Sequence, residues 1–234
     1  MSGSESFTNR RGFLLGAMKV VPAAALLSGS QAVIAEAATT PEGYKPTYFN
    51  DEEWRFIIAA VDRLIPSNED GPGALDLHVP EFIDRQMETD YGHGARWYLQ
   101  GPYYPDSDFT LGYQMRYSPR ELYRAAIPEV DDYCRKTHGK AFADLDGVAQ
   151  GEMLAALQKG VAPLNSVKPN EFFLHLLANT KEGYFSDPMY GGNYKMGAWK
   201  MIGFPGARAD FTDWMKTPGT PYPLGPVSIL GEKA

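Results

Sequence analysis

The sequence predicts a mainly α-helical protein: a single small helical domain with long loops rich in glycine, proline and aromatic residues, preceded by a twin-arginine signal segment. Three observations lead to this prediction. Apolar residues recur at helical spacing behind N-terminal caps, no alternating run is long enough for a strand, and the first 37 residues have the composition of an export signal. We divide the chain into a signal (1–37), a linker (38–49), a helical domain (50–216) and a Pro/Gly-rich tail (217–234).

The signal segment carries the most specific motif of the chain. This motif consists of Arg10, Arg11, Phe13 and Leu14. An apolar stretch to Ile34 and a small-x-small sequence at 35–37 follow, as in signals that direct folded proteins out of the cytoplasm through the Tat translocase. The alternative is a retained membrane anchor, since Gly12–Ile34 has about the 20 residues that a spanning helix needs, although Lys19 interrupts it. We expect a periplasmic protein, with cleavage of the signal left open.

The first two predicted helices follow the linker. Asn50 is an N-cap, and three acidic residues then occupy the first turn, where negative charge suits the helix dipole. Apolar residues keep helical spacing from Trp54 until Pro66, which ends the helix. Pro80 begins a second helix with Phe82 on its apolar face.

Three more helices complete the domain. Their starts are Pro119 behind the cap Ser118, Gly147 behind the cap Asp146, and Pro169. Glu121 completes a capping box with Ser118. We expect Pro128 to bend or end the first of these helices and Gly160 to stop the second, while Phe172 and its apolar neighbours place the third in the core.

The segments between helices are unusually rich in glycine, proline and aromatic residues, especially 98–117 and 187–206. Long loops of this composition are usually functional or docked, and tyrosine and tryptophan make good interface anchors. We therefore predict a partner interface in the second segment, the alternative being that its aromatics pack on this chain's own helices. The candidate residues are Asp187, Pro188, Tyr190, Gly191, Gly192, Asn193, Trp199, Gly203, Phe204, Pro205 and Gly206.

Composition and charge exclude several classes of function. The formal net charge of −7 argues against a nucleic-acid partner, whose phosphates need a basic surface. Cys134 is the only cysteine, so no internal disulfide and no cysteine-held iron–sulfur cluster can form, and we interpret it as a small apolar residue of a helix, with a bridge to a partner as the alternative.

Catalytic, cofactor and metal signatures are weak. Covalent haem, phosphate-loop and nucleophile-elbow motifs are absent from the sequence, and the turn at 71–73 lacks the third glycine of a dinucleotide fingerprint. The four histidines are isolated from one another, and His175 lies among apolar residues, as expected for a partly buried histidine. No pair of carboxylates stands out. We predict no catalytic, cofactor-binding or metal-binding residue in this chain.

Several motifs, in the same order along the chain, resemble a known family. They are the segments 62–66, 71–73, 82–84, 101–102, 182–185, 187–193 and 199–206. This pattern resembles the small subunit, called subunit 3 or gamma, of membrane-bound gluconate 2-dehydrogenase. The resemblance covers most of residues 1–215 and leaves out the C-terminal tail.

The resemblance implies an accessory subunit without a cofactor of its own. In such complexes a large flavoprotein of the glucose-methanol-choline type oxidises a sugar or sugar acid with FAD, and a multihaem cytochrome c subunit passes the electrons on to the membrane. The small subunit carries the twin-arginine signal for the flavoprotein. Two other functions stay open: a free-standing periplasmic enzyme with a pocket near Asp187, Asn193 and a histidine, and a binding or anchoring protein for another partner. The substrate of the complex also stays open.

Overall fold

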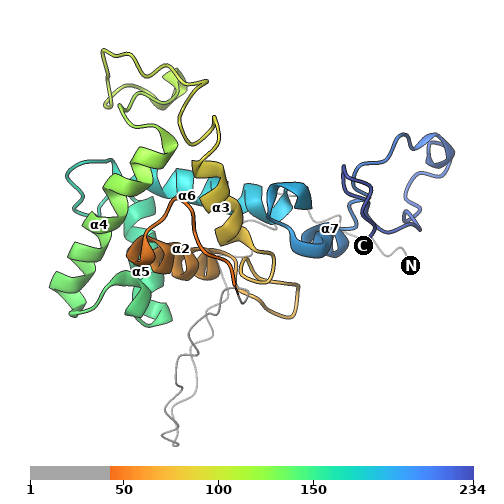
Figure 1. The fold of residues 1–234 in the computed structure, drawn as a ribbon, viewed down its shortest axis with the longest axis horizontal. Coiled ribbons are helices and arrows are strands. Elements are labelled where there is room, and N and C mark those ends of the chain that lie inside the picture. The colour runs from red at the N-terminus through yellow and green to blue at the C-terminus, as the bar shows by residue number, and fades with distance from the viewer. Residues whose placement is uncertain (1–42) are drawn as a thin grey trace, which may run out of the picture. The chain divides into compact units, whose positions relative to one another are not determined.

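The computed structural model describes residues 43–234, and over these residues it confirms the predicted fold class: there are six α-helices and no strand (Figure 1). The helices are α2 (Asp51–Leu64), α3 (Val79–Met87), α4 (Pro119–His138), α5 (Gly147–Gln158), α6 (Pro169–Phe185) and α7 (Gly197–Ile202). Short 3₁₀ helices are η1 (Phe109–Leu111), η2 (Phe142–Asp144), η3 (Pro188–Tyr190), η4 (Tyr194–Met196) and η5 (Thr212–Trp214). The predicted signal motif, Arg10 to Leu14, lies outside the described residues.

The N-terminal caps expected from the sequence are present. The Asn50 side chain accepts a hydrogen bond from the Glu53 amide at 3.0 Å, and the Asn50 amide donates to the Glu53 carboxylate at 3.0 Å, so α2 begins with a complete capping box. Asp146 caps α5 by accepting from the first free amides of that helix. These local contacts fix where the helices begin, which is why the sequence predicted their starts.

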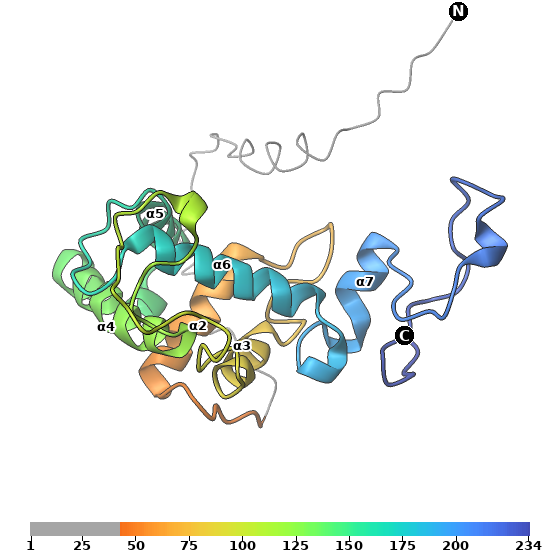
Figure 2. The same ribbon diagram turned by 90° about the horizontal axis from the view of Figure 1, so that it is seen from above.

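Helix α6 is the centre of the helical packing. It contacts α2, α3, α4, α5 and α7, and Figure 2 shows it running across the other helices. A closely packed contact with α3 needs Gly183, because a Cβ there would lie 2.7 Å from the Phe82 ring. Aromatic rings fill the core between the helices, with Phe56 4.8 Å from Phe142 and Tyr123 5.7 Å from Phe172.

Helix α4 continues through Pro128 to His138, so of the two expected outcomes, a bend or an end, this proline does not end the helix. A proline inside a helix removes one hydrogen bond, here the bond to the carbonyl of Arg124, at a typical cost of about 3 kcal/mol. Pro128 and Arg124 are both exposed, so water can solvate that carbonyl, while Val130 and Cys134 beyond the proline are fully buried. Burial on both sides of Pro128 keeps the helix intact.

The predicted linker is docked over the part that the structure describes. Residues 44–49, which we name the strap, pack on α3 and α4, and Phe49 is only 4% exposed. The Asp84 carboxylate of α3 accepts five hydrogen bonds of 2.7–3.0 Å from the strap. The Arg120 and Arg124 guanidinium groups lie 4.6 and 4.5 Å from the centre of the Tyr48 ring. Pro41, Gly43 and Pro46 are the residues that predict a linker, and within it the aromatic residues and Asp84 hold the strap in place.

The segment that was expected to be a continuous loop, 187–206, contains η3, η4 and the six-residue helix α7. The tail after Gly206 is irregular and closes on itself through bridges from Val227 to Gly206 and to Lys233. Among residues 43–234, no helix combines the length and the apolar character needed to cross a membrane.

Candidate functional site

The segment 185–206 is organised around one buried amide, that of Asn193. Its Nδ2 donates to the Ser186 carbonyl at 2.9 Å, and its Oδ1 accepts from the Ala198 amide in the first turn of α7 at 2.9 Å. Asn193 is fully buried and has a left-handed backbone (φ +45°), which asparagine tolerates better than most residues. The side chain therefore holds the turn between α6 and α7 rather than facing a ligand.

Asp187 has a structural role in the same segment. One carboxylate oxygen caps η3 by accepting from the Met189 amide at 3.1 Å, and the other accepts from the Ile229 amide of the tail at 2.7 Å. Asp187 is 7% exposed. The two polar residues that could have formed an enzyme pocket, Asp187 and Asn193, are thus both engaged by the backbone of their own chain.

The predicted glycines of this segment allow close approaches and turns. A Cβ on Gly192 would lie 2.2 Å from the Gly183 carbonyl oxygen, and a Cβ on Gly206 would lie 2.2 Å from the Val227 carbonyl oxygen. Gly191 and Gly203 follow η3 and α7 with positive φ angles of +98° and +68°. Pro188 begins η3, and Pro205 lies half-buried before Gly206.

The aromatic residues of the segment divide into a buried and an exposed set. Trp199 is 6% exposed, and its indole N–H donates to the Phe185 carbonyl at 2.9 Å. Its ring packs edge-on against Phe204 at 5.0 Å. Seven large apolar side chains between residues 185 and 204 are instead 41–56% exposed, and we name them the exposed apolar set: Phe185, Met189, Tyr190, Tyr194, Met201, Ile202 and Phe204.

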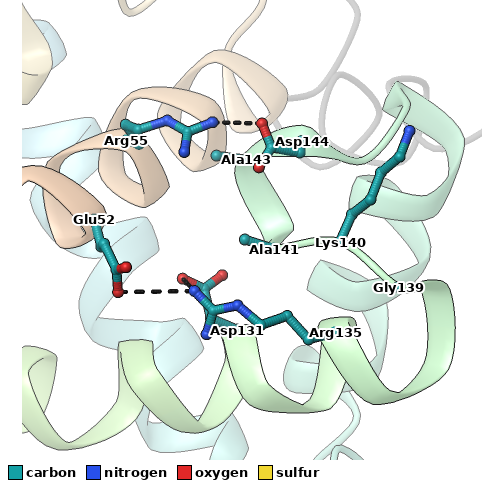
Figure 3. Close-up of a pocket in the computed structure, with 9 residues that line it drawn as sticks. All are labelled: Glu52, Arg55, Asp131, Arg135, Gly139, Lys140, Ala141, Ala143 and Asp144. Carbon is teal, nitrogen blue, oxygen red and sulfur yellow. Dashed lines mark hydrogen bonds and ion pairs between the residues drawn. The ribbon is translucent and has the colours of Figure 1, made fainter.

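A charged cavity of about 560 Å³ lies between α2, the C-terminal half of α4 and η2 (Figure 3). The charged side chains around it largely neutralise one another. Arg55 pairs with Asp144, and Arg135 pairs with Glu52 at 3.7 Å (Figure 3). Asp131 accepts a hydrogen bond from the Phe142 amide at 2.9 Å, and burial raises the pKa of its carboxyl. These contacts tie η2 to the two helices, which is a structural task.

A second cavity of about 510 Å³ lies between the end of α3, the loop that follows this helix and Tyr190 of the segment 187–206. Its main lining side chains are Gln86, Asp90, Tyr91, Arg96, Trp97 and Tyr190. Tyr91 and Trp97 are fixed from behind: the Tyr91 hydroxyl accepts from the Asn179 amide at 2.8 Å, and the Trp97 ring lies 4.6 Å from that of Tyr113. Tyr190 is the one residue of the predicted interface that reaches this cavity.

A comparison with known protein families shows to which family the chain belongs. A family model described as gluconate 2-dehydrogenase subunit 3 matches residues 51–206, two thirds of the chain. The chain belongs to the gluconate 2-dehydrogenase subunit 3 family. It therefore has an accessory role as a subunit of a multi-subunit dehydrogenase complex. No curated protein and no solved structure matched it.

The histidines of this subunit 3 chain lie in packed or surface positions. Burial lowers the pKa of His175 to about 4, and its ring lies 5.3 Å from both Trp97 and Tyr113. His78 stacks on Tyr194 at 4.1 Å. Over the residues that the structure describes, no three histidine, cysteine or acidic side chains are grouped as a metal site requires. Cys134 is fully buried, and burial raises the pKa of its thiol to about 11.

Two buried carboxyls on α3 have structural roles that the sequence did not reveal, although Asp84 lies in the motif 82–84. Asp84 receives five hydrogen bonds from the strap, whereas Glu81, 3% exposed, has no hydrogen-bond partner for either carboxyl oxygen within the described part of the chain. Burial raises the pKa of Glu81. The sequence did carry a signal of burial, because both residues lie among the apolar residues of the predicted helix. The spacing of residues alone, however, does not show that the strap covers Asp84.

Proposed function

We propose that this subunit carries the export signal for the catalytic flavoprotein of its complex and stays bound to it afterwards. The partner is an FAD-dependent dehydrogenase of the glucose-methanol-choline type that oxidises gluconate or a related sugar or sugar alcohol. A multihaem cytochrome c subunit completes the complex and associates it with the membrane. In this proposal the chain itself holds no cofactor: FAD and haem c belong to its partners.

Family membership and the N-terminal motif together support this function. A flavoprotein that is loaded with FAD in the cytoplasm has to cross the membrane already folded, so a twin-arginine signal on a tightly bound partner can serve both chains. Arg10 and Arg11, followed by Phe13 and Leu14, supply that signal in the proposal. The proposed location is the periplasm.

The single structural observation that carries the proposed partner surface is the exposed apolar set. Side chains of this size are costly to leave in water, and exposed apolar groups that gather in one segment often mark interaction sites. Asn193 and Asp187 fix the backbone beneath these side chains through buried hydrogen bonds. A pre-ordered backbone lowers the entropic cost of binding, so the flavoprotein can dock without first ordering this segment.

The export step is tested by replacing Arg10 and Arg11 with lysine in the native host and measuring where both proteins accumulate. We expect the subunit and the flavoprotein to remain together in the cytoplasm. Lys19→Gln, which changes a charge in the same segment but keeps the arginine pair, is the control and should leave export unchanged. Undiminished export of the flavoprotein by the double arginine variant would refute the proposal.

The partner surface is tested by affinity purification and mass spectrometry with Tyr190→Ala and Phe204→Ala, which are 48% and 43% exposed. If either side chain is a hot spot, its loss weakens the complex by about 2 kcal/mol or more, or about 30-fold. Leu174→Ala is the matched control, because Leu174 is 54% exposed on α6 outside the exposed apolar set. Equal recovery of the flavoprotein with all three variants would remove this surface from the interface.

A further inference from the structure

The second cavity, between Gln86 of α3, the loop 88–97 and Tyr190, is built differently from the charged cavity of Figure 3. In the charged cavity, Arg55 and Arg135 are both held by acidic side chains of the chain itself. In the second cavity, the Arg96 guanidinium and the Asp90 carboxylate make no side-chain hydrogen bond or ion pair with any residue in 43–234. The polar groups of the second cavity are therefore available to a ligand.

The unused donors and acceptors are of several kinds. The Gln86 amide, the Tyr190 hydroxyl and the Trp97 indole N–H also lack side-chain hydrogen-bond partners among the described residues, so the lining of the cavity offers both donors and acceptors. Thr89 differs, because its hydroxyl already donates to the Gln86 carbonyl at 2.8 Å. A pocket that offers both donors and acceptors, with one positive and one negative side chain, matches a ligand that has many hydroxyl groups, since each hydroxyl both donates and accepts.

Three aromatic side chains, Tyr91, Trp97 and Tyr190, add flat apolar surface to the same cavity. Tyr91 and Trp97 are held in place by Asn179, Tyr113 and His175, so the walls they form are rigid. The negative face of an aromatic ring attracts weakly positive C–H groups, which line the faces of a sugar. The volume of about 510 Å³ lies within the range of small-molecule sites, roughly 300–1,000 Å³.

We propose that this cavity binds a small polyhydroxylated molecule of the sugar or sugar-acid class. The aromatic faces of Tyr91 and Trp97 pack against the carbon skeleton, and Gln86 and Asp90 hydrogen-bond the hydroxyl groups. Arg96 gives an additional preference for a ligand that carries a carboxylate. This inference goes beyond the proposed export function, because it assigns a ligand to the accessory subunit itself.

The test is calorimetric titration of the purified full chain, without any partner, with D-glucose, sorbitol and D-gluconate as probes. We expect saturable binding of at least one probe with a dissociation constant of about 1 mM, a usual efficiency for a ligand of this size. Acetate at equal ionic strength controls for simple anion binding. Because the flavoprotein is absent, a negative result here says nothing against the export function, and a failure of co-export says nothing against this site.

Two substitutions of exposed side chains test the residues without disturbing the core. Asp90→Asn should weaken binding of every probe that binds by about tenfold or more, and Arg96→Gln should reduce the preference for gluconate over sorbitol. Arg116→Gln is the matched control, since Arg116 is an exposed arginine of the same long loop that does not line the cavity. The proposal is overturned if no probe saturates, if acetate binds as well as gluconate, or if Asp90→Asn binds like the unchanged protein.

Discussion

The strap (44–49) contains no helix and the segment 185–206 has only short helices after Phe185, and both are held by a buried polar side chain, Asp84 in the first case and Asn193 in the second. They differ in what they do with their aromatic residues. The strap turns its rings inward: Phe49 packs edge-on to Tyr123, and Tyr44 lies 5.6 Å from Trp54. The segment 185–206 buries Trp199 but leaves Tyr190 and Phe204 nearly half exposed.

This difference shows that the aromatic residues of a loop can serve two purposes: to stabilise the fold or to bind a partner. In the strap, aromatic burial and hydrogen bonds to a charged group both serve the fold of this chain. In the other segment, hydrogen bonds fix the backbone while apolar area stays in water, which gives no stability to the isolated chain and suits a partner surface. Both segments are rich in aromatic residues, and their contacts show which of these residues serve the fold.

The largest effect on stability is expected at Asp84. Asp84→Ala removes the acceptor for five hydrogen bonds and leaves the amides of Thr47, Tyr48 and Phe49 without their partner. We expect a loss of about 3–4 kcal/mol in the free energy of unfolding, measured by urea denaturation. Asp84→Asn, which keeps one carbonyl acceptor, should lose less. An Ala variant of unchanged stability would mean that the strap is not held by this carboxylate.

The corresponding change in the other segment is Asn193→Ala. It removes the acceptor of the Ala198 amide and the donor to the Ser186 carbonyl, and we expect a smaller loss of about 2 kcal/mol, with faster hydrogen exchange at Ala198. Asn193→Gly keeps the positive φ angle accessible and isolates the loss of the amide. If Asn193→Gly is as stable as the unchanged protein, the amide is not the organising contact.

The carboxyl of Glu81 lies one turn before Asp84 and has no hydrogen-bond partner in the described region. Burial raises its folded-state pKa above the ordinary value of 4.5, so the folded chain holds a proton that the unfolded chain has lost, and stability falls as pH rises through this window. Glu81→Gln cannot lose a proton. Its melting temperature should exceed that of the unchanged protein at neutral pH, with a difference that shrinks toward pH 4; Glu152→Gln on the exposed side of α5 is the control. A difference independent of pH would contradict the burial of an ionisable Glu81.

The smallest effect is expected for the exposed apolar set. Tyr190→Ala and Phe204→Ala should each lower the free energy of unfolding by only about 1 kcal/mol, because nearly half of each side chain already lies in water in the free chain. Trp199→Ala, by contrast, removes a buried ring and its hydrogen bond to Phe185, so any loss of partner binding in that variant must be corrected for its loss of stability. Large destabilisation by Tyr190→Ala would show that the exposed residues serve the fold after all.

The start of a helix could be predicted where the residues that cap it lie close to one another in the sequence. Asn50 with Glu53 and Asp146 with the following amides mark helix starts within three or four residues of sequence. The continuation of α4 through Pro128 could not be predicted this way, because it depends on tertiary burial of Val130 and Cys134. Helix α7 was not predicted, because the glycines around it favour turns.

The candidate site was harder to predict because its contacts are distant in sequence. The segment 187–206 was singled out by composition, but which of its aromatics are buried depends on the carbonyl of Phe185 that receives Trp199. The second cavity brings Tyr190 beside Asp90 and Arg96, about a hundred positions earlier, and no spacing rule connects them. The role of Asp84 likewise required knowing where the strap runs.

The strap also shows that the limits of the family match are not the limits of the folded unit. A chain cut to residues 51–206 would keep every α-helix but lose the donors that satisfy Asp84 and the ring that covers Tyr123. It would also lose Ile229, whose amide binds Asp187. For recombinant expression, the smallest sound fragment therefore begins by Gly43 and retains the tail through Ala234.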